Sequence, residues 1–231
     1  MNIAFPYFQC SAAAGRVRQY TYVAMEFFRR AQGQPAKLGI LPGTFNPPKR
    51  AHFALVRAAA PHIDEALFVL PREFPHKRYE GASFEDRVKM IETAAATLPG
   101  DLPYSIASTQ GGLFIDVARE CREAYGARAR LLFLCGRDAA ERAVAWDYGR
   151  PGAFAEMLEE FELLVFPRQG SYQPPPEMRD RIHLQPLDGS CDGISSTKVR
   201  ERVIRGGRWE HLVPSAIADM VRQIYQRAAS A

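Results

Sequence analysis

The stretch from Lys37 to Val56 brings a glycine, a lysine and a histidine to a sharp junction between two kinds of secondary structure. Apolar residues at 38–41 predict a buried strand, a turn follows at Gly43, and an apolar pattern of helical period resumes at His52. A strand, tight loop and helix in this order direct backbone N–H groups and the positive end of the helix dipole at the loop. Such a junction suits phosphate, because Gly43 permits close approach while Lys49 and His52 add charge and donors.

A second stretch near the C-terminus has a related composition, with hydroxyl and basic side chains at the expected start of a helix. It contains Ile194, Ser195, Ser196, Thr197, Lys198 and Arg200. Backbone amides, hydroxyl donors and a guanidinium together make a second candidate anion site. The alternative is an ordinary Ser/Thr helix cap with charged side chains facing water. Two such sites in one chain favour phosphate, since one triphosphate lying between them would be held at both ends.

Short apolar runs alternate with helical patterns along the chain, and these are the elements that must position both stretches. Strands are predicted at 38–41, 66–70, 104–107, 130–135, 162–166 and 181–185. Helices are predicted from His52, from Ser83 to Leu98, through 115–121, from Asp138 to Trp146, from about Ser195, and after Pro214. The alternation predicts a Rossmann-like, doubly wound, mostly parallel sheet with helices on both faces.

Residues 1–36 precede the first predicted strand. Apolar side chains at helical spacing, surrounded by arginines, predict an amphipathic helix from about Arg16 to Ala31. This helix would pack on the domain or on a second subunit. Packing on a second subunit would make the protein a homo-oligomer. We therefore expect an N-terminal helical extension at 1–36 and a single α/β domain at 37–231.

Further candidate ligand residues follow other predicted strands. His76 and Lys77 lie in a basic loop after 66–70, where a doubly wound sheet binds its ligands; the alternative is a solvated surface loop. Asp138 comes straight after 130–135, so it either accepts hydrogen bonds from a ribose hydroxyl or caps the next helix. Trp146, at the end of that helix, belongs to the core or to a pocket wall.

Composition limits the classes of partner. The chain has 231 residues, 47% of them hydrophobic, and a net charge of +4 from 30 basic and 26 acidic residues. This charge implies no polyanion partner. No apolar run approaches the ~20 residues of a membrane span, and no secretory signal is present, so we expect a cytoplasmic protein without a membrane partner. The cysteines, which form no Cys-x-x-Cys pair, fit a reduced protein better than a disulfide framework or zinc site; they are Cys10, Cys121, Cys135 and Cys191.

The two phosphate motifs resemble those of the His-x-Gly-His nucleotidyltransferase superfamily, and in particular its nicotinate-mononucleotide adenylyltransferase branch. The similar residues are Gly43-Thr44-Phe45-Asn46-Pro47-Pro48 with His52, and Ile194-Ser195-Ser196-Thr197 with Arg200. Pro75-His76-Lys77, Arg87 with Met90, Gly136 and Asp138 with Trp146, and Arg168 with Gly170 follow in the order of that branch. The resemblance covers about 37–225.

The chain departs from the branch at four places. The branch has Asp at Asn46, His at Lys49 and Gly at Ala51, so only the second histidine of the signature is retained. Lys49 is a point charge that can hold a phosphate oxygen but lacks the geometry of imidazole. The branch also has hydroxyl side chains near 112–114, where it holds the nicotinate group, and this chain has none there.

The resemblance implies transfer of AMP from ATP to a phosphorylated acceptor, nicotinate or nicotinamide mononucleotide first of all, with release of pyrophosphate. Mg²⁺ would arrive with ATP, mostly bound by water, without a metal site built by the protein. Catalytic contacts are expected from Lys49, His52 and Arg200. Nucleotide contacts are expected from Gly43, Thr44, Phe45, Asn46, Gly136, Asp138, Ile194, Ser195, Ser196 and Thr197. The acceptor pocket is expected at His76, Lys77, Trp146 and Arg168.

Three alternatives remain at this point. Lys49 and Ala51 also fit a nucleotide-binding protein with weak or no catalysis. The enzyme could instead be a cytidylyltransferase or adenylyltransferase that acts on a different phosphorylated acceptor. The two motifs bear a distant likeness to class I aminoacyl-tRNA synthetases, but no segment of the size of an anticodon-binding or editing domain is present, so no nucleic-acid partner is expected.

Overall fold

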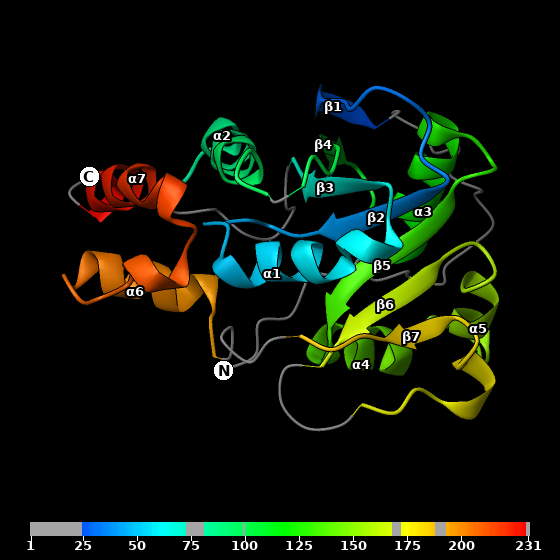
Figure 1. The fold of residues 1–231 in the computed structure, drawn as a ribbon. Coiled ribbons are helices and arrows are strands. Elements are labelled where there is room, and N and C mark those ends of the chain that lie inside the picture. Colours follow the sequence, from blue (N-terminus) through cyan, green and yellow to red (C-terminus); the bar gives the residue numbers. More distant parts are fainter. Residues whose placement is uncertain (1–24, 73–80, 99, 168–171, 188–192, 230–231) are drawn as a thin grey trace, which may run out of the picture.

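The computed structural model describes residues 25–72, 81–98, 100–167, 172–187 and 193–229. Within them the strands form one seven-stranded sheet in the order β1-β4-β3-β2-β5-β6-β7 (Figure 1). Every neighbouring pair is parallel except β1 and β4. The strands are β1 (Glu26–Arg29), β2 (Lys37–Pro42), β3 (Glu65–Pro71), β4 (Tyr104–Thr109), β5 (Arg130–Gly136), β6 (Glu162–Phe166) and β7 (Ile182–Leu184).

The sheet reverses its direction of growth at β2. From β2 the chain adds β3 and β4 on one side, then crosses over to β5 and adds β6 and β7 on the other. In open α/β sheets this switch point is where ligands bind, just beyond the carboxyl ends of the strands. The central strands are buried along nearly their whole length, which explains why they are continuous apolar runs instead of alternating patterns.

Helices cover both faces of the sheet, as Figure 1 shows. One apolar core lies under α1 (Arg50–Ala59), α2 (Phe84–Ala95), α6 (Ser196–Ile204) and α7 (Ala218–Ala229). The other lies under α3 (Phe114–Tyr125), α4 (Arg137–Ala145) and α5 (Ala153–Met157). These layers confirm the predicted Rossmann-like class. Among the helices of the described residues, none has both the length and the apolar character needed to cross a membrane.

The predicted N-terminal helix is wrong where the structure describes it. Glu26–Arg29 is a strand that pairs with β4, with Glu26 opposite Ser108. Phe27 contacts Tyr125 of α3, with ring centroids 5.9 Å apart, whereas its neighbour Phe28 contacts Phe84 of α2 at 5.2 Å. Adjacent aromatic residues thus point to opposite faces, which is the periodicity of a strand. Residues 1–24, with the rest of the predicted helix, lie outside the described residues.

Two of the four cysteines can be placed. Cys121 and Cys135 are buried and carry free thiols. Burial raises the pKa of Cys135 to about 12 and raises that of Cys121 as well. Both stay protonated near neutral pH, so neither acts as a thiolate nucleophile. Cys10 and Cys191 lie outside the described residues.

Candidate phosphate site at the sheet switch point

The structure brings the two predicted phosphate motifs into direct contact. The Ser196 hydroxyl donates a hydrogen bond to the carbonyl oxygen of Pro47 over 3.0 Å, across 149 positions of sequence. Arg200 Nη1 donates to the carbonyl oxygen of Asn46 over 2.7 Å, across 154 positions. The start of α6 therefore lies against the loop that joins β2 to α1, at the switch point of the sheet.

The backbone of that loop is fixed from behind. The Gly43 N–H donates to the Val69 carbonyl of β3 over 2.9 Å, and the Thr44 carbonyl accepts from Arg87 Nη1 over 3.0 Å. In a trans peptide the C=O and N–H groups point in opposite directions. The N–H of Phe45 therefore faces away from Arg87. The loop thus directs the Thr44 carbonyl oxygen at the Arg87 guanidinium and the Phe45 N–H to the opposite side.

Gly43 and Phe45 are fitted to each other. A Cβ added to Gly43 would lie only 3.0 Å from Cζ of Phe45. The Phe45 backbone has φ of 50°, in the left-handed region, and its fully buried ring meets the ring of His52 edge-on at 4.9 Å. A side chain at this position would therefore press on the buried Phe45 ring, a packing reason for glycine that the sequence pattern alone did not reveal.

The contacts of His52 define which of its nitrogens carries the proton. Nδ1 accepts a hydrogen bond from the Lys49 backbone N–H over 3.1 Å, and the His52 N–H donates to the Lys49 carbonyl over 3.0 Å. A nitrogen that accepts carries no proton, so in the neutral ring Nε2 is the N–H donor. His52 is therefore oriented by the first turn of α1 to donate from Nε2.

The second motif, at the start of α6, contains both a helix cap and residues that contact the first motif; the sequence left a cap and an anion site as alternatives. Ser195 is an ordinary N-cap, since its Oγ accepts from the Lys198 N–H over 3.1 Å. Ser196 and Arg200 instead contact the first motif, and Arg200 Nη2 also lies 3.5 Å from Thr197 Oγ1. A guanidinium has several N–H donors in a fixed fork, so Arg200 can bind Asn46 and still present donors to a phosphate.

Gly136 and Asp138 lie at the neighbouring strand end. In the register of β2 and β5, Ile40 pairs with Phe133. Gly43 and Gly136 each lie three residues after these partners, so they are at equivalent positions where the two neighbouring strands end. Asp138 does not cap α4: the N-cap is Gly136, and the Asp138 side chain is 79% exposed with Arg137 Nε 3.6 Å away. Helix capping by Asp138 is therefore wrong, and its contact with a ribose stays a prediction.

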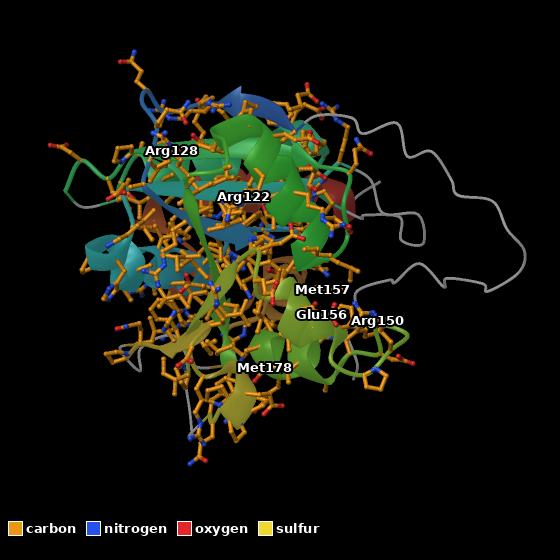
Figure 2. All side chains as sticks on the ribbon, turned by 90° about the vertical axis from the view of Figure 1, so that its right-hand side faces the viewer. Arg122, Arg128, Arg150, Glu156, Met157 and Met178 are labelled. Carbon is orange, nitrogen blue, oxygen red and sulfur yellow. The ribbon has the colours of Figure 1, made fainter. Side chains whose placement is uncertain are left out.

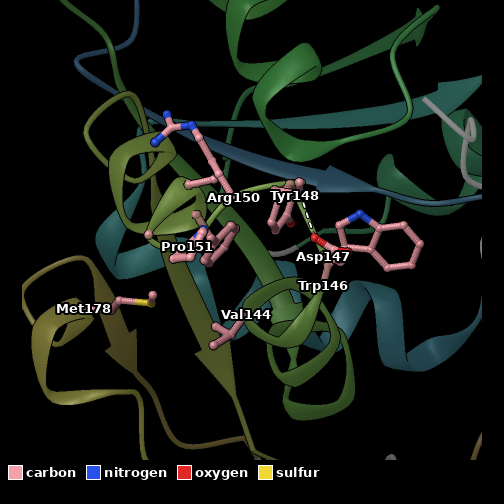
Figure 3. Close-up of a pocket in the computed structure, with 11 residues that line it drawn as sticks. Val144, Trp146, Asp147, Tyr148, Arg150, Pro151 and Met178 are labelled. Atoms are coloured by element: carbon pink, nitrogen blue, oxygen red, sulfur yellow. Dashed lines mark hydrogen bonds between the residues drawn. The ribbon is translucent and has the colours of Figure 1, made fainter. Parts of the chain in front are cut away.

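Of the predicted acceptor residues, only Trp146 lies within the described part of the chain. It ends α4 and borders a cavity of about 400 Å³ whose wall also includes Val144, Arg150 and Met178 (Figure 3). Figure 2 shows Arg150 and Met178 on the right-hand side of the molecule in Figure 1, whereas β2 and β3 point to the left. These two wall residues therefore lie toward the end of the sheet opposite the phosphate loop. His76, Lys77 and Arg168 lie outside the described residues, and the acceptor pocket stays a prediction.

Two residues that hold the loop were missed as site residues. Arg87 is 2% exposed, and its guanidinium lies over the Phe84 ring at 5.3 Å while it donates to Thr44. The Tyr225 hydroxyl donates to Oδ1 of Asn46 over 2.5 Å. Tyr225 is buried in an apolar stripe with Ile217 and Val221, and such a pattern gives no sign of its hydroxyl's partner.

Comparisons with known proteins agree with this arrangement. Residues 40–202 match the cytidylyltransferase-like family. A "Probable nicotinate-nucleotide adenylyltransferase" of Gloeobacter violaceus is 33% identical over 210 residues, which cover 84% of this chain and 98% of that protein. The protein of the same name from Moorella thermoacetica is 29% identical over 203 residues, which cover 82% of this chain and 90% of that protein.

Solved structures share the fold. The nicotinic acid mononucleotide adenylyltransferase of Plasmodium falciparum, complexed with APC, superimposes with a TM-score of 0.61 at 14% identity, covering 82% of this chain and 96% of that one. Its complex with NaAD gives a TM-score of 0.61 at 15% identity, covering 82% of this chain and 97% of that one. The chain therefore belongs to the cytidylyltransferase-like family of nucleotidyltransferases, in its nicotinate-nucleotide adenylyltransferase branch.

Proposed function

We propose that this protein transfers the adenylyl group of ATP to nicotinate or nicotinamide mononucleotide, forming the dinucleotide precursor or product of NAD synthesis and releasing pyrophosphate. The observation that carries the proposal is the contact of Ser196 and Arg200 with the backbone of 46–47 at the sheet switch point. This contact unites two donor-rich helix starts into one site. The names of the relatives support the same reaction.

The reaction is an in-line displacement at phosphorus. A phosphate oxygen of the acceptor attacks the α-phosphorus of ATP, a new P–O bond forms, and the bond from the α-phosphorus to the oxygen that bridges to the β-phosphate breaks. Because no covalent enzyme intermediate is needed, catalysis consists of positioning and of stabilising charge on the phosphates. The Phe45 N–H, His52 Nε2 and the guanidinium of Arg200 are the donors in place for this, and Lys49 adds a positive charge.

The proposal includes Mg²⁺ as part of the ATP complex. The described residues contain no group of three or more His, Cys, Asp or Glu side chains that could hold a metal ion. The donor set of the site is cationic and amide-rich, which fits phosphate oxygens and not a bare divalent cation. Mg²⁺ would therefore bind phosphate oxygens and water, and would neutralise charge on the triphosphate. A cytoplasmic location and a homo-oligomeric state stay predictions.

A different nucleotide or acceptor is the second candidate, because the family match is to cytidylyltransferase-like proteins and 112–114 contain no hydroxyl side chain. The test is pyrophosphate release from MgATP and from MgCTP with a panel of nicotinate mononucleotide, nicotinamide mononucleotide and ribose phosphates. We expect release with ATP and a pyridine mononucleotide. Release only with CTP or only with a ribose phosphate would establish the second candidate, and tight ATP binding without release would indicate a binding protein.

A further inference from the structure

Asn46 is held at both its backbone and its side chain by the two C-terminal helices. Its carbonyl oxygen accepts from Arg200 of α6 over 2.7 Å, and its side-chain Oδ1 accepts from the Tyr225 hydroxyl of α7 over 2.5 Å. Asn46 and Tyr225 are 4% and 2% exposed. Both bonds are therefore shielded from water, where losing one partner leaves a buried polar group unsatisfied.

Tyr225 is fixed in turn by close packing. A Cβ at Gly81 would lie 2.5 Å from Cε1 and 2.7 Å from Cδ1 of its ring, so this edge of the ring occupies the space that a side chain at Gly81, where φ is +105°, would need. Burial raises the pKa of the Tyr225 hydroxyl, and nearby Arg200 and Arg87 only partly oppose this effect. The phenol is thus neutral near pH 7 and remains a donor to Asn46.

The Tyr225–Asn46 pair leaves the positive charge of the site intact. Arg87 donates to the Thr44 carbonyl and Arg200 to the Asn46 carbonyl, so two guanidinium groups flank the loop. The group between them is a neutral amide, which orients the loop without placing a carboxylate beside the phosphates. Of the hydrogen bonds that hold the loop, those from Arg87 and Arg200 are cationic, and those made by Tyr225, Ser196 and the Gly43 N–H are neutral.

We propose that Tyr225 is a positioning residue for ATP: through Asn46 its hydroxyl holds the 43–47 loop in the shape that receives the triphosphate. Tyr225 lies outside the residues, 40–202, that match the family, so α7 completes a site that the two motifs begin. This inference rests on the proposed function, because it assigns the loop to ATP.

The test is Tyr225→Phe, which removes only the hydroxyl. The matched control is Tyr125→Phe, whose hydroxyl donates to buried Glu65 over 2.7 Å at the amino end of β3, away from the loop. Tyr225→Phe should weaken ATP binding, measured calorimetrically without acceptor, by roughly tenfold, and should lower kcat/KM for ATP while the KM for the acceptor stays within about twofold. Tyr125→Phe should lower thermal stability and leave ATP binding unchanged.

A double-mutant cycle separates positioning from stability. If the two residues act as a unit, Asn46→Ala and the double variant with Tyr225→Phe should bind ATP equally weakly. Independent, additive losses would contradict the proposal, as would unchanged ATP binding by Tyr225→Phe, or an equal loss in Tyr125→Phe. Failure of the wild-type protein itself to bind ATP would overturn the proposed function, whereas wild-type binding that Tyr225→Phe retains would overturn this inference alone.

Discussion

The role of single residues is clearest at His52. Its Nδ1 is occupied by the Lys49 backbone N–H, so Nε2 is the nitrogen that donates. We predict that His52→Ala lowers turnover at least tenfold and typically about a hundredfold, because a missing transition-state donor typically costs ~3 kcal/mol. The measurement is kcat under saturating substrates, with circular dichroism to verify the fold. His62→Ala, in the 3-10 turn that follows α1, is the control. Unchanged turnover in His52→Ala would remove His52 from the mechanism.

Lys49 tests whether the departure from the family signature matters. It is the N-cap residue of α1, and its backbone N–H donates to Nδ1 of His52. Lys49→His restores the residue of the branch and keeps that backbone bond, so we predict activity equal to or above that of the wild type. Steady-state kcat/KM for ATP decides the matter. If activity collapses, the ammonium group of Lys49 has a role of its own that imidazole cannot replace.

At the scale of elements, the strands that position the site were predictable and the edge strand was not. The runs at 38–41, 130–135 and 162–166 are buried on both faces, so composition alone identifies them. β1 exists because Phe27 and Phe28 find aromatic partners on α3 and α2. Such tertiary contacts override local periodicity, and no local pattern contains them.

The amino ends of β5, β6 and β7 are joined by one buried carboxylate. Glu162, whose side chain is 8% exposed, accepts from Arg130 Nε over 2.6 Å and from His183 Nε2 over 2.5 Å. Burial opposes ionisation of Glu162, but the hydrogen bonds from Arg130 and His183 outweigh it and hold the pKa of Glu162 below its usual value. The carboxylate therefore stabilises the fold while it is ionised.

We predict that Glu162→Gln lowers the free energy of unfolding at pH 7 by about 1–3 kcal/mol, because charge-assisted bonds are lost. A lowered folded pKa gives stability that is full above the unfolded pKa and is lost as pH falls through the folded value. The difference between wild type and variant should thus shrink below about pH 4. Urea unfolding at pH 7 and at pH 3 measures this difference.

The control is Glu156→Gln, in an exposed pair with Arg150, which should change the free energy of unfolding little. A loss of stability in Glu162→Gln that does not depend on pH would contradict this account.

For the molecule as a whole, the sequence contains the two ends of the site but not what holds them. Glycine, hydroxyl and basic residues at two helix starts predicted one polyphosphate site, and the bonds from Ser196 and Arg200 to 46–47 unite these ends. Arg87, although part of the family resemblance, and Tyr225 were not predicted as site residues. Their polar atoms act inside the core, where a sequence shows only a charge in a helix or an aromatic in an apolar stripe. Their partners depend on how α2 and α7 pack.

Transfer of the α-phosphorus from ATP to a pyridine mononucleotide tests the central claim most directly. The wild-type protein would be incubated with nicotinate mononucleotide or with nicotinamide mononucleotide, in each case with α-labelled or with γ-labelled MgATP. The structure predicts that the α-label appears in the dinucleotide and the γ-label in pyrophosphate, in equal amounts. Label in inorganic phosphate alone, or ATP that binds and is not consumed with either pyridine mononucleotide, would contradict it.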